Sequence, residues 1–238
     1  MQWWCAALGE QWTWSWRAYP GVWLFVIAII AGFRWLAGPS SWARASVAER
    51  VAFIAGAVTL WISLDWPLGP IAAGYLVSAH ALQFLIVTMF ASPFLLIGSR
   101  TGFVEQVAAR GPGRASITAA RLLVHPLVAA ILFNVVVAAT HVPSVVDGLM
   151  PSALGAFAVD AAWLAGGIIF WWPVIMPAPR YERFGPPLKI LYLLIGTLFH
   201  TVIGMVMLSA EFPMYGIYEL APPIVAISST RRAGILNS

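Results

Sequence analysis

The chain has 238 residues, of which 61% are hydrophobic and 9% are charged, whereas about 25% of the residues in a soluble domain are charged. Its mean hydropathy is +0.86 and its formal net charge is +4, values that exclude a soluble globular protein. Because the basic residues lie between apolar segments, the charge indicates membrane orientation and gives no reason to expect nucleic-acid binding. The single cysteine, Cys5, excludes an internal disulfide and a thiolate metal cluster within one chain.

Tryptophan is concentrated at the start of the chain. Seven tryptophans fall within the first 35 residues: Trp3, Trp4, Trp12, Trp14, Trp16, Trp23 and Trp35. Tryptophan favours the headgroup layer of a bilayer. Residues 1–19 are therefore predicted to be a Trp-rich segment along the outer interface, with a docking surface for a partner as the alternative.

Six apolar segments follow, each close to the ~20 residues that a helix needs to cross ~30 Å of hydrocarbon. They cover residues 20–37, 50–67, 72–98, 119–140, 153–176 and 188–210. The predicted fold is all-α, a polytopic membrane helix bundle of about six transmembrane helices. The bundle occupies residues 20–210, and residues 211–238 form a short outer C-terminal tail.

Basic residues sort between the connections. The first, third and fifth connections are flanked by Arg34, Arg44, Arg50, Arg100, Arg110, Arg114, Arg121, Arg180, Arg183 and Lys189. The second and fourth, around residues 65–71 and 141–152, contain none. The positive-inside rule then predicts that the odd connections are cytoplasmic and that both termini lie outside. Arg231 and Arg232 in the tail depart from this pattern.

Three titratable side chains lie inside apolar segments: His80, Asp160 and His200, with His141 at the outer boundary of a fourth. At about 1.5 Å per residue, His80 and Asp160 are predicted to lie ~12 Å below the outer surface and His200 ~15 Å. Such groups are costly in hydrocarbon, so each is a candidate functional residue. Imidazoles and a carboxylate converging from several helices can bind copper or another transition metal.

These four residues are the predicted metal ligands, and Met205 and Met207 near His200 offer thioethers, which favour Cu(I). Two other interpretations remain open. The histidines can serve as hydrogen-bonding groups between helices, with Asp160 paired to one of them or protonated. His80 and His200 can also be the axial ligands of one b-type haem.

Several short motifs occur in a fixed order. The third segment contains Ser78-Ala79-His80-Ala81-Leu82-Gln83-Phe84 and then Ser92-Pro93-Phe94-Leu95-Leu96-Ile97-Gly98. Around it stand Asp65-Trp66-Pro67-Leu68, His125-Pro126, His141-Val142-Pro143, Phe170-Trp171-Trp172-Pro173, Leu191-Tyr192-Leu193-Leu194 and Tyr215-Gly216-Ile217-Tyr218. Over about residues 50–220 this order resembles the multi-pass CtaG family of cytochrome c oxidase assembly factors.

The resemblance implies a role in inserting copper into haem–copper oxidases, or in assembling them. His80 and His141 match the family motifs, but Phe84 stands where the family has a second histidine. In the fifth segment the family usually carries histidines near a glutamate, and this chain has Ala156, Phe157 and Asp160 there. The family's seventh helix is absent or reduced to the tail.

The leading functional prediction is a membrane-embedded assembly factor for a haem–copper terminal oxidase in a bacterial inner membrane, handling copper on the outer side. Its expected partners are subunits of that oxidase or of another energy-transducing complex, together with the lipid bilayer. The alternative is a non-catalytic accessory subunit of a larger respiratory or photosynthetic complex that keeps the scaffold without the metal site. An enzyme is not expected, because the sequence shows no nucleophile–base set, and paired broken helices typical of transporters are not evident.

Overall fold

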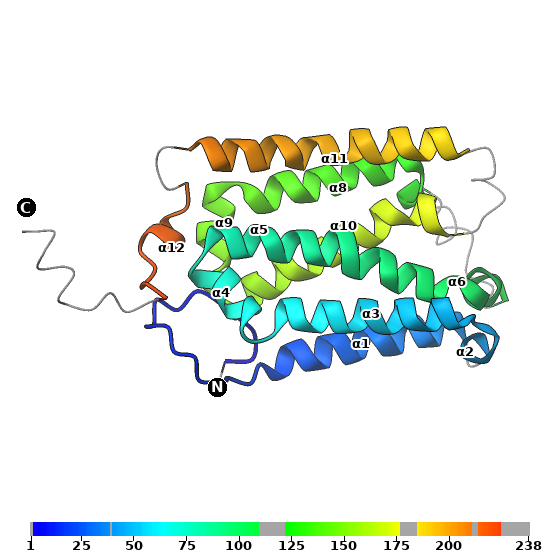
Figure 1. Ribbon diagram of the computed structural model, residues 1–238, viewed down its shortest axis with the longest axis horizontal. Helices are drawn as coiled ribbons and strands as arrows, with labels where there is room; N and C mark the ends of the chain where they lie inside the picture. Colours follow the sequence, from blue (N-terminus) through cyan, green and yellow to red (C-terminus); the bar gives the residue numbers. More distant parts are fainter. Residues whose placement is uncertain (1, 39, 110–121, 177–184, 211–213, 225–238) are drawn as a thin grey trace, which may run out of the picture.

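The computed structural model describes residues 2–38, 40–109, 122–176, 185–210 and 214–224. Every regular element in these ranges is a helix (Figure 1): α1 Pro20–Ala37, α2 Ser41–Arg44, α3 Val47–Leu64, α4 Leu68–Gly74, α5 Val77–Leu85, the π-helix η1 Ile86–Ala91, α6 Ser92–Ala109, α8 Pro126–His141, α9 Pro143–Leu149, α10 Ala153–Ile175, α11 Pro186–Ser209 and α12 Gly216–Glu219. Outside the described ranges lie Arg110, Arg114, Arg121, Arg180, Arg183, Arg231, Arg232 and most of the predicted tail.

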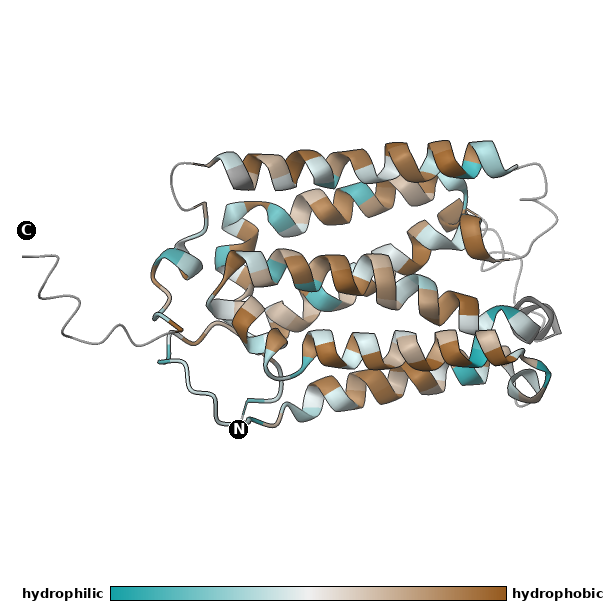
Figure 2. Cartoon of the chain, in the orientation of Figure 1, coloured by the Kyte–Doolittle hydropathy of each residue, from teal (hydrophilic) through white to brown (hydrophobic). Residues whose placement is uncertain are grey.

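The predicted all-α membrane bundle of about six spans is confirmed. Five helical runs are long and apolar enough to cross a membrane, and α8 with α9 makes a sixth, bent by 70° between its two parts. Figure 2 shows hydrophobic residues along the length of these helices. The third span starts later than predicted, because residues 68–74 form the separate helix α4. His80 therefore lies on the first turn of α5, only about 5 Å from the helix start.

The spans pack in a sequence of neighbours. Helices α1 and α3 pack on α6, which continues from α5 through η1; α6 and η1 pack on α10, α10 on α8, and α8 on α11. The N-terminal segment and α12 lie at one end of the bundle, and α2 lies at the other (Figure 1). We call these the outer end and the inner end, since the basic-residue pattern predicts that both termini are outside.

Local sequence explains several helix boundaries. Ser46 and Glu49 form a reciprocal capping box at the start of α3, and Ser152 accepts the Gly155 amide at the start of α10. Pro93 follows η1 and has no amide hydrogen to donate, which favours a local change in the helical hydrogen bonding there. Gly56 lets α3 approach α6 closely, since a Cβ at that position would lie 2.8 Å from the Leu95 amide nitrogen.

The N-terminal segment is tied across the outer end of the bundle. The Ala7 amide donates to the Met150 carbonyl at 2.9 Å, the Gly21 amide donates to the Trp3 carbonyl at 2.8 Å, and Tyr75 Oη donates to the Glu10 carbonyl at 2.7 Å. Trp14 and Trp16 are 64% and 60% exposed, which suits an interfacial position, but Trp4 is fully buried. Trp4 thus departs from the interfacial position that was predicted for the tryptophans of residues 1–19.

Candidate functional site

His80 is enclosed by aromatic rings at the outer end. Its side chain is fully buried, and its ring centre lies 4.9 Å from that of Trp163, 6.0 Å from that of His141 and 6.0 Å from that of Tyr218. Neither imidazole nitrogen makes a hydrogen bond with the described residues. The Ala72 carbonyl is near the ring and accepts the Tyr218 hydroxyl at 2.6 Å. Its second lone pair remains open to a ring N–H, but that contact lacks hydrogen-bond geometry, so both nitrogens are without a hydrogen-bond partner among the described residues.

His141, the last residue of α8, has its ring orientation fixed by its own helix. Its Nδ1 lies 2.8 Å from the Val137 carbonyl oxygen, and since a carbonyl only accepts, Nδ1 carries the hydrogen. The lone pair of the neutral ring is then on Nε2. The His141 backbone carbonyl accepts the Tyr215 hydroxyl at 3.0 Å, which joins the end of α8 to the segment that carries α12.

Phe84 occupies the centre of the cluster. Its ring centre lies 5.0 Å from His141, 5.4 Å from Trp163 and 5.9 Å from His200. His200 also packs with its ring centre 5.7 Å from that of Phe133, and its Nδ1 is buried without a hydrogen-bond partner in the described part of the chain. The position where the resemblance expects a second histidine thus contacts both His141 and His200, and this chain fills it with a phenyl ring.

Asp160 has a different partner from those predicted. Its Oδ2 accepts the Trp4 indole hydrogen at 2.8 Å, while Oδ1 is buried and no described residue gives it a hydrogen bond. Trp4 also packs edge-on against Phe157, with ring centres 5.0 Å apart. Positions 157 and 160 of α10, where the resemblance expects metal-binding side chains, therefore hold the N-terminal segment in place.

Cys5 lies beside this contact and is a poor candidate ligand. Its thiol is buried and donates to the Leu64 carbonyl at 3.2 Å. Burial raises the pKa of the Cys5 thiol, and the charges of Asp160 and Asp65 raise it further. Because metals bind the thiolate, this environment disfavours a metal–sulfur bond.

A groove of about 380 Å³ opens next to the cluster, between the start of α5, the end of α11 and α12. Met207, Met214 and Glu219 line the groove. Tyr218 also lines it, and the Tyr218 ring centre lies 6.0 Å from that of His80. Burial raises the pKa of Tyr215 to about 12 and also raises that of Tyr218, so both hydroxyls remain hydrogen-bond donors at neutral pH. Met205, predicted as a helper, is 65% exposed and does not line this groove.

Asp147 holds α12 over this end of the bundle. Its two carboxylate oxygens accept the Gly216 and Ile217 amides, each at 3.1 Å. This is the pattern of an acidic side chain at a helix N-terminus. This connection between α9 and α12, together with the hydrogen bonds that the Tyr215 and Tyr218 hydroxyls donate to the His141 and Ala72 carbonyls, keeps both tyrosines against the histidine pair.

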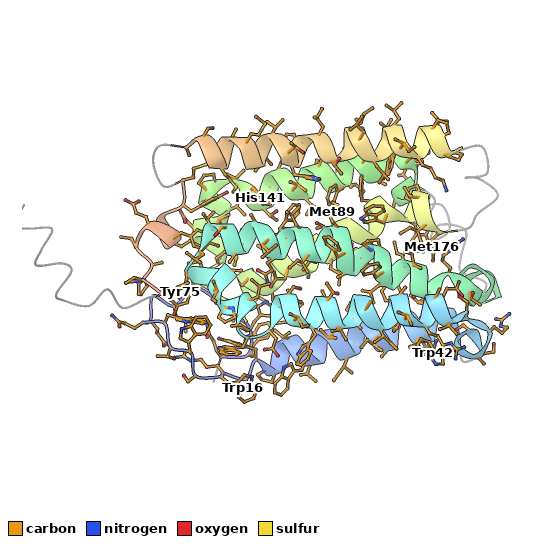
Figure 3. The ribbon with its side chains drawn as sticks, in the orientation of Figure 1. Trp16, Trp42, Tyr75, Met89, His141 and Met176 are labelled. Atoms are coloured by element: carbon orange, nitrogen blue, oxygen red, sulfur yellow. The ribbon has the colours of Figure 1, made fainter. Side chains whose placement is uncertain are left out.

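The four predicted ligands are thus distributed over three places. His80 and His141 face one another (Figure 3 shows His141 toward the outer end), His200 lies beyond Phe84, and Asp160 is held by Trp4. Among the described residues, no group of three or more His, Cys, Asp or Glu side chains is arranged to hold a metal ion. Metal binding by His80, His141, Asp160 and His200 stays a prediction.

Sequence reasoning assigned no site role to Trp4, Trp163 or Tyr218. Trp163 had a local signal, because it follows Asp160 by three residues and so shares its helix face, and Tyr218 ends the motif Tyr215-Gly216-Ile217-Tyr218. The Trp163 indole donates to Thr140 Oγ1 at 2.9 Å, which connects α10 to α8 beside His141. Trp4 and Tyr218 reach the cluster from outside the spans, where helical spacing gives no information.

Comparison with curated proteins and with solved structures found no match. A family model described as cytochrome c oxidase caa3 assembly factor (Caa3_CtaG) matches residues 23–234, which is most of the chain. The matched region contains the histidine pair, Phe84, Asp160 and α12, whereas Trp4 lies before it. The chain therefore belongs to the cytochrome c oxidase caa3 assembly factor family, as the ordered motifs of its sequence predicted.

Proposed function

We propose that this assembly factor carries Cu(I) on the outer side of a bacterial inner membrane and delivers it to a haem–copper oxidase, with His80 and His141 as its copper ligands. The observation that supports this most directly is the state of His80. Its imidazole is fully buried beside His141, and neither nitrogen has a hydrogen-bond partner among the described residues. A buried polar group without a partner is unfavourable, and copper would provide that partner.

The geometry of the pair suits a shared ion. With metal–nitrogen bonds of about 2 Å, two imidazoles on one ion hold their ring centres roughly 4–6 Å apart. The observed separation is 6.0 Å, at the wide end of this range, which suits two ligands on opposite sides of the ion. A metal-binding histidine usually donates its other ring N–H to a carbonyl or carboxylate, as His141 does toward Val137.

Copper is the cargo that the surrounding residues favour. Imidazole and thioether ligands together select Cu(I), and Met207 and Met214 line the groove that Tyr218 separates from His80. Two imidazole ligands with two weaker thioether ligands nearby suit an ion that is first bound and later released. We infer that the groove receives copper, and that the oxidase subunit docks over α12 to accept it.

A direct test is anaerobic loading of the detergent-purified protein with Cu(I), followed by measurement of copper retained per chain. We expect about one equivalent for the wild-type chain and strong loss in His80→Phe and His141→Gln. His80→Phe keeps an aromatic ring and removes two unpartnered nitrogens, so its thermal stability should equal or exceed that of the wild type. His125→Gln, at the other end of α8, is the matched control and should retain copper.

Two results would contradict the proposal. One is full copper retention by His80→Phe. The other is normal copper content of the oxidase in cells that carry His80→Phe as their sole copy of this chain. Destabilisation of His80→Phe with unchanged copper binding would mean that His80 serves helix packing alone.

The second candidate is a non-catalytic accessory subunit, and the ring of Phe84 at the family's histidine position favours it. A chain that has lost a ligand can keep its scaffold for contact with other subunits. This function predicts no retained copper and stable, stoichiometric co-purification with oxidase subunits in mild detergent. Recovery of the chain alone, with copper bound, would contradict it.

A further inference from the structure

The inner end of the bundle contains a groove that the copper proposal does not use. It has a volume of about 480 Å³ and lies between α1 and α3, lined by Ile30, Arg34, Trp42, Phe53, Ile54, Ala57 and Val58. Trp42 is at the opposite end of the molecule from Tyr75 and Trp16 (Figure 3). Ile54 and Val58 are 53% and 44% exposed on its wall. The groove is thus apolar along most of its length and open at the side of the bundle.

Arg34 stands at the inner end of this groove in a fixed position. It lies in the last turn of α1, its guanidinium carbon is 5.0 Å above the Trp42 ring centre, and its Nη1 donates to Ser41 Oγ at 3.3 Å. Ser41 Oγ in turn donates to the Gly38 carbonyl at 2.7 Å. A guanidinium has five N–H donors, so most of them remain available on a side chain that is already oriented.

Arg50 adds a second positive charge at the same end. It precedes Ile54 by four residues on α3, so the two side chains share a helix face. Its Nε is buried and has no hydrogen-bond partner among the described residues. In the part of the chain that the structure describes, no carboxylate forms an ion pair with Arg34 or Arg50. Arg34 thus lines an apolar groove, and Arg50 stands one helical turn from the lining residue Ile54, both without an ion-pair partner among the described residues.

We propose that this groove binds one anionic phospholipid, with an acyl chain against Ile54, Ala57 and Val58 and the headgroup phosphate at Arg34 and Arg50. The order of the residues matches the molecule: apolar side chains extend into the span, and the charges and Trp42 lie at its end, at headgroup depth. Basic pockets between transmembrane helices on the cytoplasmic side bind anionic headgroups, and the arginine pattern predicts that this end is cytoplasmic.

A lipid fits this groove better than a partner helix. The groove's lining residues on α3 are apolar and include the small Ala57, so a flexible acyl chain can lie against them, while Arg34 and Arg50 favour a compact anion at one end. A phosphate diester with a net negative headgroup meets both requirements. A zwitterionic lipid provides the acyl chain but also places a cation near the two arginines.

Native mass spectrometry of the detergent-purified full chain provides the test, with phosphatidylglycerol and phosphatidylcholine of identical acyl chains as probes. We expect the first phosphatidylglycerol to bind more tightly than phosphatidylcholine, by about fivefold for each arginine. Arg34→Gln should lower this preference by about that factor. Ala57→Phe should remove the tight site, and Ile54→Trp, which fills the groove from its exposed rim, repeats the test should Ala57→Phe fail to fold.

Arg17→Gln is the matched control, since Arg17 is an exposed arginine at the outer end, paired with Glu10 at 2.7 Å. It should leave lipid binding unchanged. Equal affinity for the two lipids in the wild-type chain, or unchanged preference in Arg34→Gln, would overturn the proposal. Stabilisation of the lipid-free protein by inorganic phosphate alone, as large as that by phosphatidylglycerol, would also overturn it, because the site would then recognise a free anion.

Discussion

The two ends of this bundle treat polar side chains in opposite ways. At the outer end, His80 and Asp160 are buried under aromatic rings and under two chain segments that lie across the helices. At the inner end, Arg34 and Arg50 stand beside a groove that is open to the side. An unpartnered imidazole in an enclosed cluster favours a small ion that can enter, whereas a charge on an open rim favours the surrounding bilayer. Our two proposals therefore place copper binding at the enclosed end and lipid binding at the open end.

The largest effect should come from breaking the outer enclosure at Trp4. Trp4→Ala removes a fully buried ring and leaves Asp160 without its indole donor, so we expect a loss of about 3–5 kcal/mol in the free energy of unfolding. Trp4→Phe keeps most of the ring and removes the donor alone, for which about 1.5–3 kcal/mol is expected. Denaturant unfolding in detergent measures both.

Trp14→Ala is the control for this prediction, because Trp14 is 64% exposed, and its effect should stay within about 0.5 kcal/mol. A Trp4→Ala variant as stable as Trp14→Ala would show that the N-terminal segment does not brace the bundle. The two ends would then differ less than their side-chain contacts indicate.

The next effect concerns α12, which covers the groove at the outer end. Asp147→Ala removes both carboxylate hydrogen bonds to the Gly216 and Ile217 amides, and we expect local opening of α12 to become easier by about 2 kcal/mol. Hydrogen exchange at these two amides should accelerate accordingly, and bound copper should leave faster. Leu220→Gln, a change just after this helix at a position that is 84% exposed, should do neither. Unchanged hydrogen exchange in Asp147→Ala would mean that the Asp147 carboxylate does not hold α12 over the site.

Phe84→His sharpens the comparison by adding a ligand at the outer end. Phe84 contacts both His141 and His200, so an imidazole there can join His80 and His141 on one ion. We expect Cu(I) affinity to rise by about tenfold or more, the scale on which single groups at metal sites act. Leu82→His on the same helix, at a position 50% exposed, should leave affinity unchanged. A Phe84→His variant with wild-type affinity would mean that the histidine pair is not the copper site.

The sequence predicts the membrane spans of this structure better than it predicts the site. The bilayer fixes the length and hydropathy of each span, so five helices fall close to the predicted segments. The fourth segment was predicted to end at residue 140, but its bent span continues through α9, residues 143–149, which were predicted to be a connection. The start of the third span was missed, because the apolar stretch from residue 72 continues through the separate helix α4. Hydropathy does not reveal where one helix ends and the next begins within a single apolar stretch.

The site depended on information that no local pattern contains. Burial costs singled out His80, Asp160 and His200, with His141 at the boundary of a span, yet which of them meet is decided by the order of helices around the bundle. The Trp4–Asp160 hydrogen bond joins residues 156 positions apart. A tryptophan outside the spans suggests an interfacial position on composition alone, and only the tertiary structure shows it as the partner of a buried carboxylate.

The smallest predicted effect is a pH dependence that comes from Cys5. Burial beside Asp160 and Asp65 raises the pKa of this thiol in the folded chain, while an unfolded thiol has a pKa of about 8.5. The protonated thiol is therefore favoured by folding, so stability is complete below pH 8 and falls as the unfolded chain releases its proton above pH 8.5. At pH 9 this loss is about 0.8 kcal/mol. Cys5→Ala should show a flatter stability profile between pH 8 and 9, below the range where tyrosines titrate. Parallel profiles for the two chains would mean that the thiol is not enclosed. The N-terminal segment would then not cover the outer end of the bundle at Cys5.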